Sequence, residues 1–146
     1  MSHIRLENVS KVFDANASEA AKVLKLLQQG MSSGEVREQT GYSVGLYDIN
    51  LSVEAGELHC IMGLSGSGKS TLIRHINRLI DPTQGKIWID TQHSVGTPDY
   101  LDSAERLSDQ SRVINVLSLR DKPLQKFRQN NVSMVFQHFG LVPHMT

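Results

Sequence analysis

A glycine-rich segment in the middle of the chain constrains the fold more than any other feature. Residues 63–70 read Gly-Leu-Ser-Gly-Ser-Gly-Lys-Ser and fit the pattern G-x-x-x-x-G-K-[S/T], with Thr71 directly after them. Such a segment binds phosphate when a strand leads into it and a helix follows it. The apolar run at 58–62 predicts a strand buried on both faces of a parallel sheet, and apolar spacing predicts a helix over 69–80. We therefore expect an α/β fold.

The residue types of this loop suit a nucleotide phosphate chain with Mg²⁺. Glycines permit positive φ angles and bring backbone N–H groups close to phosphate oxygens, and the N-terminus of the next helix adds free N–H groups. We expect Lys69 to bridge the β- and γ-phosphates, the Ser70 hydroxyl to bind Mg²⁺, and Thr71 to lie beside the α-phosphate. The residues expected to bind the nucleotide are Gly63, Leu64, Ser65, Gly66, Ser67, Gly68, Lys69, Ser70 and Thr71. A glycine turn without a ligand is the alternative interpretation.

Apolar periodicity predicts the other elements. Strands are expected at 4–13, 46–53, 86–90 and 132–136, and helices at 18–29 and 121–129. A second short helix should begin after Ser32, which has capping-box spacing to Glu35, and end at Gly41. Leu124, Phe127 and Val135 are expected in the core. The polar stretch 91–110 has no sustained period and is expected to be a surface insertion.

Composition excludes several classes of protein. The 15 Lys+Arg residues balance the 15 Asp+Glu residues, which argues against sequence-independent nucleic-acid binding and against a polybasic membrane patch. The single Cys60 cannot form an intramolecular disulfide and is expected to be a buried thiol within the strand at 58–62. His59 and His75 have no partner at ligand spacing and are expected to be structural. Arg5 and Glu7 stand where a signal peptide needs its apolar core, so we expect a cytoplasmic protein.

Four segments in order resemble the ATP-binding subunits of ABC transporters: 54–57 (Glu-Ala-Gly-Glu), 63–71, 81–85 (Asp-Pro-Thr-Gln-Gly) and 134–137 (Met-Val-Phe-Gln). The resemblance implies an incomplete P-loop NTPase domain of the ABC type, with an antiparallel β part at its N-terminus. Residues 1–146 would form the N-terminal part of that domain, with a helical insertion at 15–43 and a polar insertion at 91–112. The helical insertion, together with 61–71 and 139–146, is most similar to the glycine betaine/proline betaine importers.

The resemblance also assigns roles to residues outside the loop. Phe13 stands where the family stacks an aromatic ring on adenine, although an ordinary strand-end aromatic is the alternative. Gln137 matches the glutamine that reaches Mg²⁺ and the attacking water, so Lys69 and Gln137 would be the catalytic residues, with an exposed polar residue as the alternative for Gln137. Residues 138–146 would face the groove where the membrane subunits dock.

Other family motifs are absent from the sequence. Leu107-Ser108-Asp109-Gln110 lacks the glycine pair of the LSGGQ signature, and Thr91 follows Ile87-Trp88-Ile89-Asp90 where a catalytic glutamate is required. No switch histidine can be assigned. Because phosphoryl transfer to water needs a carboxylate, we expect residues 1–146 to bind Mg-nucleotide weakly without turnover. We also expect the apolar strand at 58–62 to lack a neighbour and to promote aggregation.

The whole protein implied by the resemblance is an ATPase subunit that drives uptake of glycine betaine, proline or a related compatible solute. Its expected partners are a second ATPase subunit in a head-to-tail homodimer, transmembrane permease subunits and, indirectly, a solute-binding protein. It would lie on the inner face of the cell membrane. A non-catalytic truncated nucleotide-binding protein and a P-loop small-molecule kinase are the alternatives.

Overall fold

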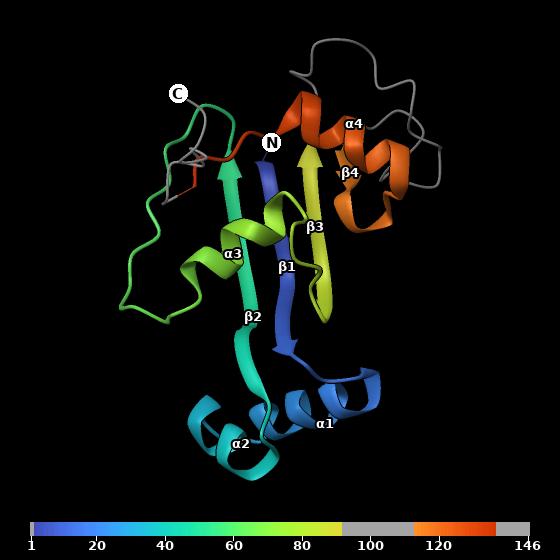
Figure 1. Cartoon of the computed structure of the whole chain (residues 1–146). Helices are drawn as coiled ribbons and strands as arrows, with labels where there is room; N and C mark the ends of the chain where they lie inside the picture. Colours follow the sequence, from blue (N-terminus) through green and yellow to red (C-terminus); the bar gives the residue numbers. More distant parts are fainter. Residues whose placement is uncertain (1, 92–112, 137–146) are drawn as a thin grey trace, which may run out of the picture.

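A four-stranded antiparallel sheet forms the centre of the molecule (Figure 1). The structure is a computed structural model that describes residues 2–91 and 113–136. The strand order is β2-β1-β3-β4, in which β1 covers Ser2–Phe13, β2 Ser43–Glu54, β3 Gln84–Asp90 and β4 Val113–Asn115. The strands expected at 4–13, 46–53 and 86–90 are confirmed, as is the antiparallel N-terminal part.

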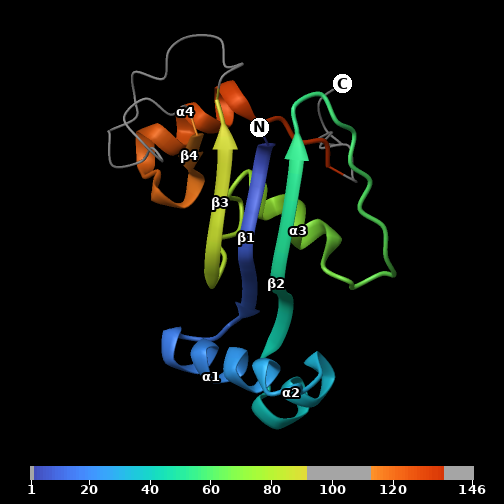
Figure 2. The same ribbon diagram turned by 180° about the vertical axis from the view of Figure 1, so that it is seen from behind.

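The main core lies between this sheet and two helices. Leu6 is the centre of the register, because it pairs with Leu51 on one side and with Ile87 on the other. Helix α3 (Lys69–Ile76) crosses in front of the sheet in Figure 1 and behind it in Figure 2, so it covers a single face. The side chains of Leu72 and of Phe127, from α4 (Asp121–Asn131), are buried in this core.

Two helices between β1 and β2 form a second, smaller core. Helices α1 (Ala17–Gln28) and α2 (Ser33–Thr40) each begin with a capping box, built from Asn16 with Glu19 and from Ser32 with Glu35. Gly41 ends α2 in the left-handed conformation, with φ of 78°, which glycine adopts without strain. Both helices are as predicted, and so are the Ser32–Glu35 capping box and the Gly41 end of α2, because these signals are local. The Asn16–Glu19 capping box was not predicted.

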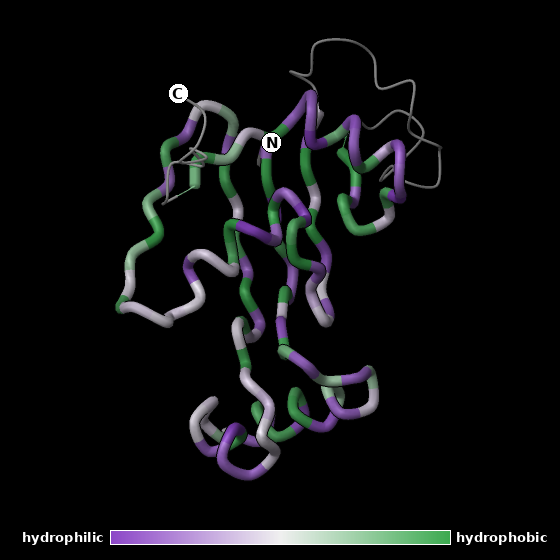
Figure 3. The backbone as a smooth tube through the Cα atoms, in the orientation of Figure 1, coloured by the Kyte–Doolittle hydropathy of each residue, from purple (hydrophilic) through white to green (hydrophobic). Residues whose placement is uncertain are grey.

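The strand expected at 58–62 is wrong. This segment has no regular structure, and Leu58 and Met62 are 90% and 89% exposed. The free thiol of Cys60, expected to be buried, is exposed as well. A strand needs a neighbour to satisfy its N–H and C=O groups, and none of the four described strands pairs with this segment. Figure 3 shows the apolar stretch between β2 and α3 running outside the sheet.

The strand expected at 132–136 is also wrong. The chain is irregular after α4, and Val135, expected in the core, is 91% exposed. Phe127 is fully buried and Leu124 packs against the core, as predicted. Helix α4 itself is confirmed, and the short 3₁₀ helix η2 (Val116–Ser118) that precedes it was not predicted.

Helix α3 ends four residues earlier than the predicted Ile80. Asn77 caps it, and Arg78 takes the left-handed conformation with φ of 54°. The N–H groups of Leu79 and Ile80 then both donate to the Arg74 carbonyl, at 2.9 and 3.1 Å. The chain therefore turns away before it reaches Pro82.

Several predicted features lie outside the described residues. They are residues 92–112 of the polar insertion predicted at 91–112, which include the Leu107–Gln110 segment, together with Gln137 and the docking segment 138–146. Thr91, which the sequence places at the start of the exposed insertion, is described and is buried, because it directly follows the buried end of β3. Within the ranges 2–91 and 113–136, every helix is too short and too polar to span a bilayer.

Candidate functional site

A cavity of about 560 Å³ lies between the glycine loop and the ends of β1 and β2. Three segments line it: Phe13 at the end of β1, residues 43–45 at the start of β2, and residues 65–71. Seven of the nine loop residues predicted to bind a nucleotide therefore lie on one cavity. Gly63 and Leu64 do not line it, and the Leu64 side chain is 86% exposed.

The backbone of the loop requires glycine where it approaches β2. Gly66 and Gly68 have φ angles of 81° and 87°, which favour glycine. A Cβ atom on Gly68 would stand 2.5 Å from the Gly45 carbonyl oxygen, so no side chain fits between the loop and β2. Gly68 is also the N-cap of α3, and no side chain caps this end. The first N–H groups of α3 are thus available to an anion.

The Lys69 ammonium is held by the loop itself. Its Nζ donates to the carbonyl oxygens of Gly63 and Leu64, at 2.7 and 2.6 Å, and to the Ser67 hydroxyl at 3.2 Å. These partners place the cation beside the cavity that Lys69 lines. A phosphate oxygen can compete for the same donor, because a full negative charge makes a stronger hydrogen bond than a neutral carbonyl.

Phe13 brings an aromatic ring to the same cavity. It pairs with Ser43 in the β1–β2 register, and its ring packs so closely on Gly45 that a Cβ there would lie 2.4 Å from Phe13 Cε2. The Lys11 ammonium lies 5.5 Å from the centroid of the ring and donates to the Asp81 carbonyl at 2.8 Å. The ring is therefore held in place by Gly45 of β2 and by Lys11 of its own strand.

Ser70 and Thr71 also line the cavity, at the first turn of α3. One turn further on, His75 Nδ1 donates to the Thr71 carbonyl at 2.6 Å. His75 is fully buried, and burial is the main cause that lowers its pKa below the usual value. His59, by contrast, is partly exposed and contacts Glu57 at 2.9 Å. Neither imidazole belongs to the lining of the cavity.

The β2 side of the site was not predicted from the sequence. Ser43, Val44 and Gly45 line the cavity because antiparallel pairing places them opposite the end of β1. The one sequence feature that could have indicated this side of the site is Gly45, directly before the strand predicted at 46–53. Gln137, predicted to reach Mg²⁺, lies beyond the described residues. Among residues 2–91 and 113–136, no group of three or more His, Cys, Asp or Glu side chains could hold a metal ion.

Comparison with known proteins places these features in a family. The profile of the ABC transporter family matches residues 46–146. The chain is 43% identical, over all 146 of its residues, to the glycine betaine/carnitine transport ATP-binding protein GbuA of Listeria monocytogenes. It is 36% identical over 143 residues, 98% of this chain, to the glycine betaine/proline betaine transport ATP-binding protein ProV of Escherichia coli. The chain spans 30% of the length of each of these relatives.

Solved structures give the same result for the fold. The dimeric ABC transporter cassette MJ0796 superposes with a TM-score of 0.60 and 29% identity, over 98% of this chain and 42% of that one. A second structure of that cassette, described as a post-hydrolysis state bound to ADP and Pi, has the same TM-score with 27% identity. The N-terminal antiparallel part and the glycine loop thus belong to a cassette fold of which this chain contains a portion.

Proposed function

Because the chain belongs to the ABC transporter family, we propose that its cavity binds Mg-ATP and that the protein serves as the ATP-binding part of an importer. The observation that carries this proposal is the meeting of Phe13 and the loop residues 65–71 on one cavity. An aromatic ring at one end and unsatisfied N–H groups with a lysine at the other match the two ends of a nucleotide. The names of the relatives support ATP as that nucleotide.

Each residue has a defined task in this proposal. The backbone N–H groups of the loop and of the first turn of α3 donate to the phosphates, and Lys69 leaves its carbonyl partners to bridge the β- and γ-phosphates. Phe13 stacks on adenine. Mg²⁺ suits the site because it is usually held by one or two protein oxygens together with substrate phosphates, and the Ser70 hydroxyl supplies such an oxygen. Gln137 would orient water beside the metal.

Residues 1–146 include groups that can bind Mg-ATP but lack groups that its hydrolysis requires. Phosphoryl transfer to water needs the attacking water to be oriented, in addition to neutralisation of the phosphate charge. The sequence contains neither an apolar run that ends in Asp-Glu nor an LSGGQ segment, and Asp90-Thr91 precedes Gln137, whereas the family's catalytic glutamate follows that glutamine. We therefore propose that residues 1–146 bind Mg-ATP without hydrolysing it. Hydrolysis coupled to transport is proposed for the whole protein.

The solute and partners are proposed from the relatives. GbuA and ProV are named as ATP-binding proteins of betaine transport systems, which supports uptake of glycine betaine or a related compatible solute. The dimeric state of the solved cassette supports a second ATPase subunit as a partner. Permease subunits, a solute-binding protein and a position on the inner face of the membrane complete this proposal.

Substitution of Lys69 tests the phosphate end of the site. Lys69→Ala should weaken MgATP binding about 10- to 100-fold in calorimetry, because a hydrogen bond to a charged group contributes about 1.5–3 kcal/mol. Lys25→Ala, which removes an exposed lysine of α1, should leave affinity unchanged. Equal affinity of the Lys69→Ala variant and the unaltered chain would refute the proposed site. ATP hydrolysis that disappears with Lys69→Ala would refute binding without turnover.

Substitution of Phe13 tests the base end of the same site. Phe13→Ala should weaken ATP binding, because stacking of a base on an aromatic ring contributes about 1–3 kcal/mol. It should leave the affinity for inorganic triphosphate unchanged, because that ligand has no base, and Phe13→Tyr should retain the affinity for ATP. An equal loss for ATP and triphosphate would show that Phe13 supports the loop and does not contact the base.

A further inference from the structure

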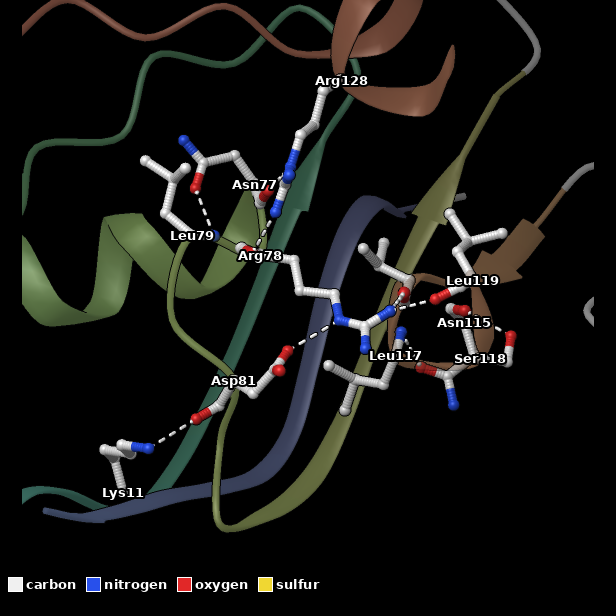
Figure 4. Close-up of polar contacts among 11 residues, drawn as sticks. Lys11, Asn77, Arg78, Leu79, Asp81, Asn115, Leu117, Ser118, Leu119 and Arg128 are labelled. Atoms are coloured by element: carbon white, nitrogen blue, oxygen red, sulfur yellow. Dashed lines mark hydrogen bonds and ion pairs between the residues drawn. The ribbon is translucent and has the colours of Figure 1, made fainter. Parts of the chain in front are cut away.

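The end of α3 opposite the glycine loop is held by an arginine from α4. The last carbonyl groups of a helix lack partners within the helix, and a cation there also interacts favourably with the helix dipole. Arg128 supplies both hydrogen-bond donors and a positive charge at this end of α3. Its Nε donates to the Asn77 carbonyl at 3.1 Å and its Nη2 to the Arg78 carbonyl at 2.5 Å. Figure 4 shows Arg128 directed at these two residues. Helix α3 is thus fixed to α4 just beyond its last turn.

A second arginine, Arg78, lies just beyond the end of α3 and bonds carbonyl groups in and after η2. Arg78 Nη1 donates to the carbonyl oxygens of Val116, at 3.3 Å, and of Leu119. Its Nε bonds the Asp81 carboxylate at 2.7 Å, and its side chain is only 18% exposed. The left-handed backbone of Arg78 is unfavourable for a residue with a side chain and persists where surrounding contacts determine it. These contacts are the ones that Figure 4 draws.

The hydrogen bonds of Arg78 and Arg128 form a network that reaches both Phe13 and the glycine loop, the two ends of the proposed nucleotide site. The Asp81 carbonyl accepts from Lys11, whose ammonium lies over the Phe13 ring. Asn77 donates to Met134 Sδ at 3.1 Å, in the segment that follows α4. Helix α3, only eight residues long, joins the network to the loop through its first turn. Polar contacts therefore connect the cavity with residues 116–134 through the C-terminal end of α3.

We propose that Arg78 and Arg128 are positioning residues that couple nucleotide binding to η2 and α4. This inference rests on the proposed binding of MgATP at the first turn of α3. Binding that orders the loop restrains α3, and the two arginines transmit the restraint because they bond η2 and α4 to its other end. Such coupling is reciprocal, so a partner that displaces α4 would also change nucleotide affinity.

Hydrogen–deuterium exchange of the 146-residue chain, with and without MgATP, tests the coupling because it reports local opening segment by segment. In the unaltered chain, MgATP should slow exchange at 63–72 and also at 116–131, by about fivefold or more in both segments. In Arg128→Gln, slowing at 63–72 should remain and slowing at 116–131 should be lost. Arg128→Lys, which keeps one cationic donor, should retain part of it.

Arg120→Gln is the matched control, because it removes an exposed arginine before α4 and should retain both effects. A purely structural role of Arg128 would speed exchange throughout 116–131 but leave its slowing by MgATP intact, and that result would overturn the inference. If Arg128→Gln fails to fold, Asp81→Asn replaces it as the test. This variant removes the carboxylate that pairs with Arg78 and should reduce the slowing of exchange at 116–131 by MgATP. Absence of any slowing at 63–72 in the unaltered chain would refute the proposed nucleotide site itself.

Discussion

At the scale of single residues, His75 is a fully buried titratable group in α3, one turn after Thr71. Its Nδ1 donates to the Thr71 carbonyl, and its Nε2 has no hydrogen-bond partner among the described residues. Burial lowers its pKa, and the nearby charge of Lys11 lowers it further, whereas the hydrogen bond to Thr71 and the charge of Asp81 oppose that shift. The folded protein therefore favours the neutral imidazole.

This preference predicts acid sensitivity. Since the pKa of His75 is lower in the folded state, the unfolded chain binds the proton more readily, and stability should fall as pH drops below 6.5, the ordinary pKa. The loss from one group cannot exceed about 1.4 kcal/mol per pH unit. Urea unfolding from about pH 7.5 to about pH 5 measures it.

His75→Asn keeps an amide donor for Thr71 but cannot become protonated, so it should flatten the pH dependence even if it lowers stability throughout. His59→Asn, at a partly exposed position, is the control and should leave most of the dependence in place. The same acid-induced loss in His75→Asn would show that another group is responsible.

The candidate site shows what single-residue patterns can predict. The loop residues were predicted because the motif is contiguous and its chemistry is local, and seven of the nine line the cavity. The resemblance to a family added Phe13, which the structure places on the cavity, and Gln137, which stays a prediction. Residues 43–45 were missed because their position depends on pairing with β1, thirty residues away in the sequence.

At the scale of elements, the turn into β3 depends on close contact with β1. Gly85 has φ of 108°, and a Cβ there would lie 2.6 Å from Val9 Cα and 2.7 Å from the Asn8 carbonyl oxygen. Both are backbone atoms of a central strand, so neither can move without disturbing the β1–β3 pairing. Gly56 provides a contrast, because it has φ of 81° with no atom within 4 Å of its Cβ position.

We predict that Gly85→Ala is more destabilising than Gly56→Ala. The left-handed backbone alone should make Gly56→Ala cost about 1–2 kcal/mol, and the clash should add at least about 1–3 kcal/mol for Gly85→Ala. Denaturant midpoints of the two variants, compared with the unaltered chain, measure the difference. Equal losses would mean that the β1–β3 pairing relaxes around a side chain at position 85.

Helices and strands were predicted correctly where they depend on residues close together in the sequence, and wrongly where they depend on distant partners. Helix α2 was predicted with both of its ends, because the Ser32–Glu35 capping box and Gly41 are local signals. Helix α1 was predicted from its apolar spacing, and its Asn16–Glu19 capping box was not predicted. The strands expected at 58–62 and 132–136 were wrong, because an apolar run becomes a strand only if another strand pairs with it. The length of α3 was overestimated because Asn77 and Arg78, held by Arg128 of α4, end the helix.

At the scale of the whole molecule, exposed apolar side chains gather just before the glycine loop and at its start. Leu58, Met62 and Leu64 are 90%, 89% and 86% exposed. Burial of apolar area contributes about 25 cal/mol per Å², and contiguous exposed apolar residues favour association. The 146-residue chain is therefore expected to self-associate as its concentration rises.

The double variant Leu58→Ser/Met62→Ser should reduce this association, as measured by light scattering during size-exclusion chromatography at matched concentrations. Tyr47→Ser, a change on β2 at a side chain that is 37% exposed, should leave the association unchanged. A monomeric unaltered chain across the concentration range would contradict the prediction, as would equal association of the double variant.

Features that depend on neighbouring residues follow from the sequence alone: the glycine loop with Lys69 and Ser70, the two short helices between β1 and β2, and the strands at 4–13, 46–53 and 86–90. Three other features follow from the fold. Phe13 and residues 43–45 meet the glycine loop, Arg128 binds the end of α3 from about 50 positions away in the sequence, and residues 58–62 form no strand. A capping hydrogen bond joins residues that are three or four positions apart in the sequence. A cavity, a paired strand or the contact of Arg128 with α3 instead requires residues that only the fold brings together.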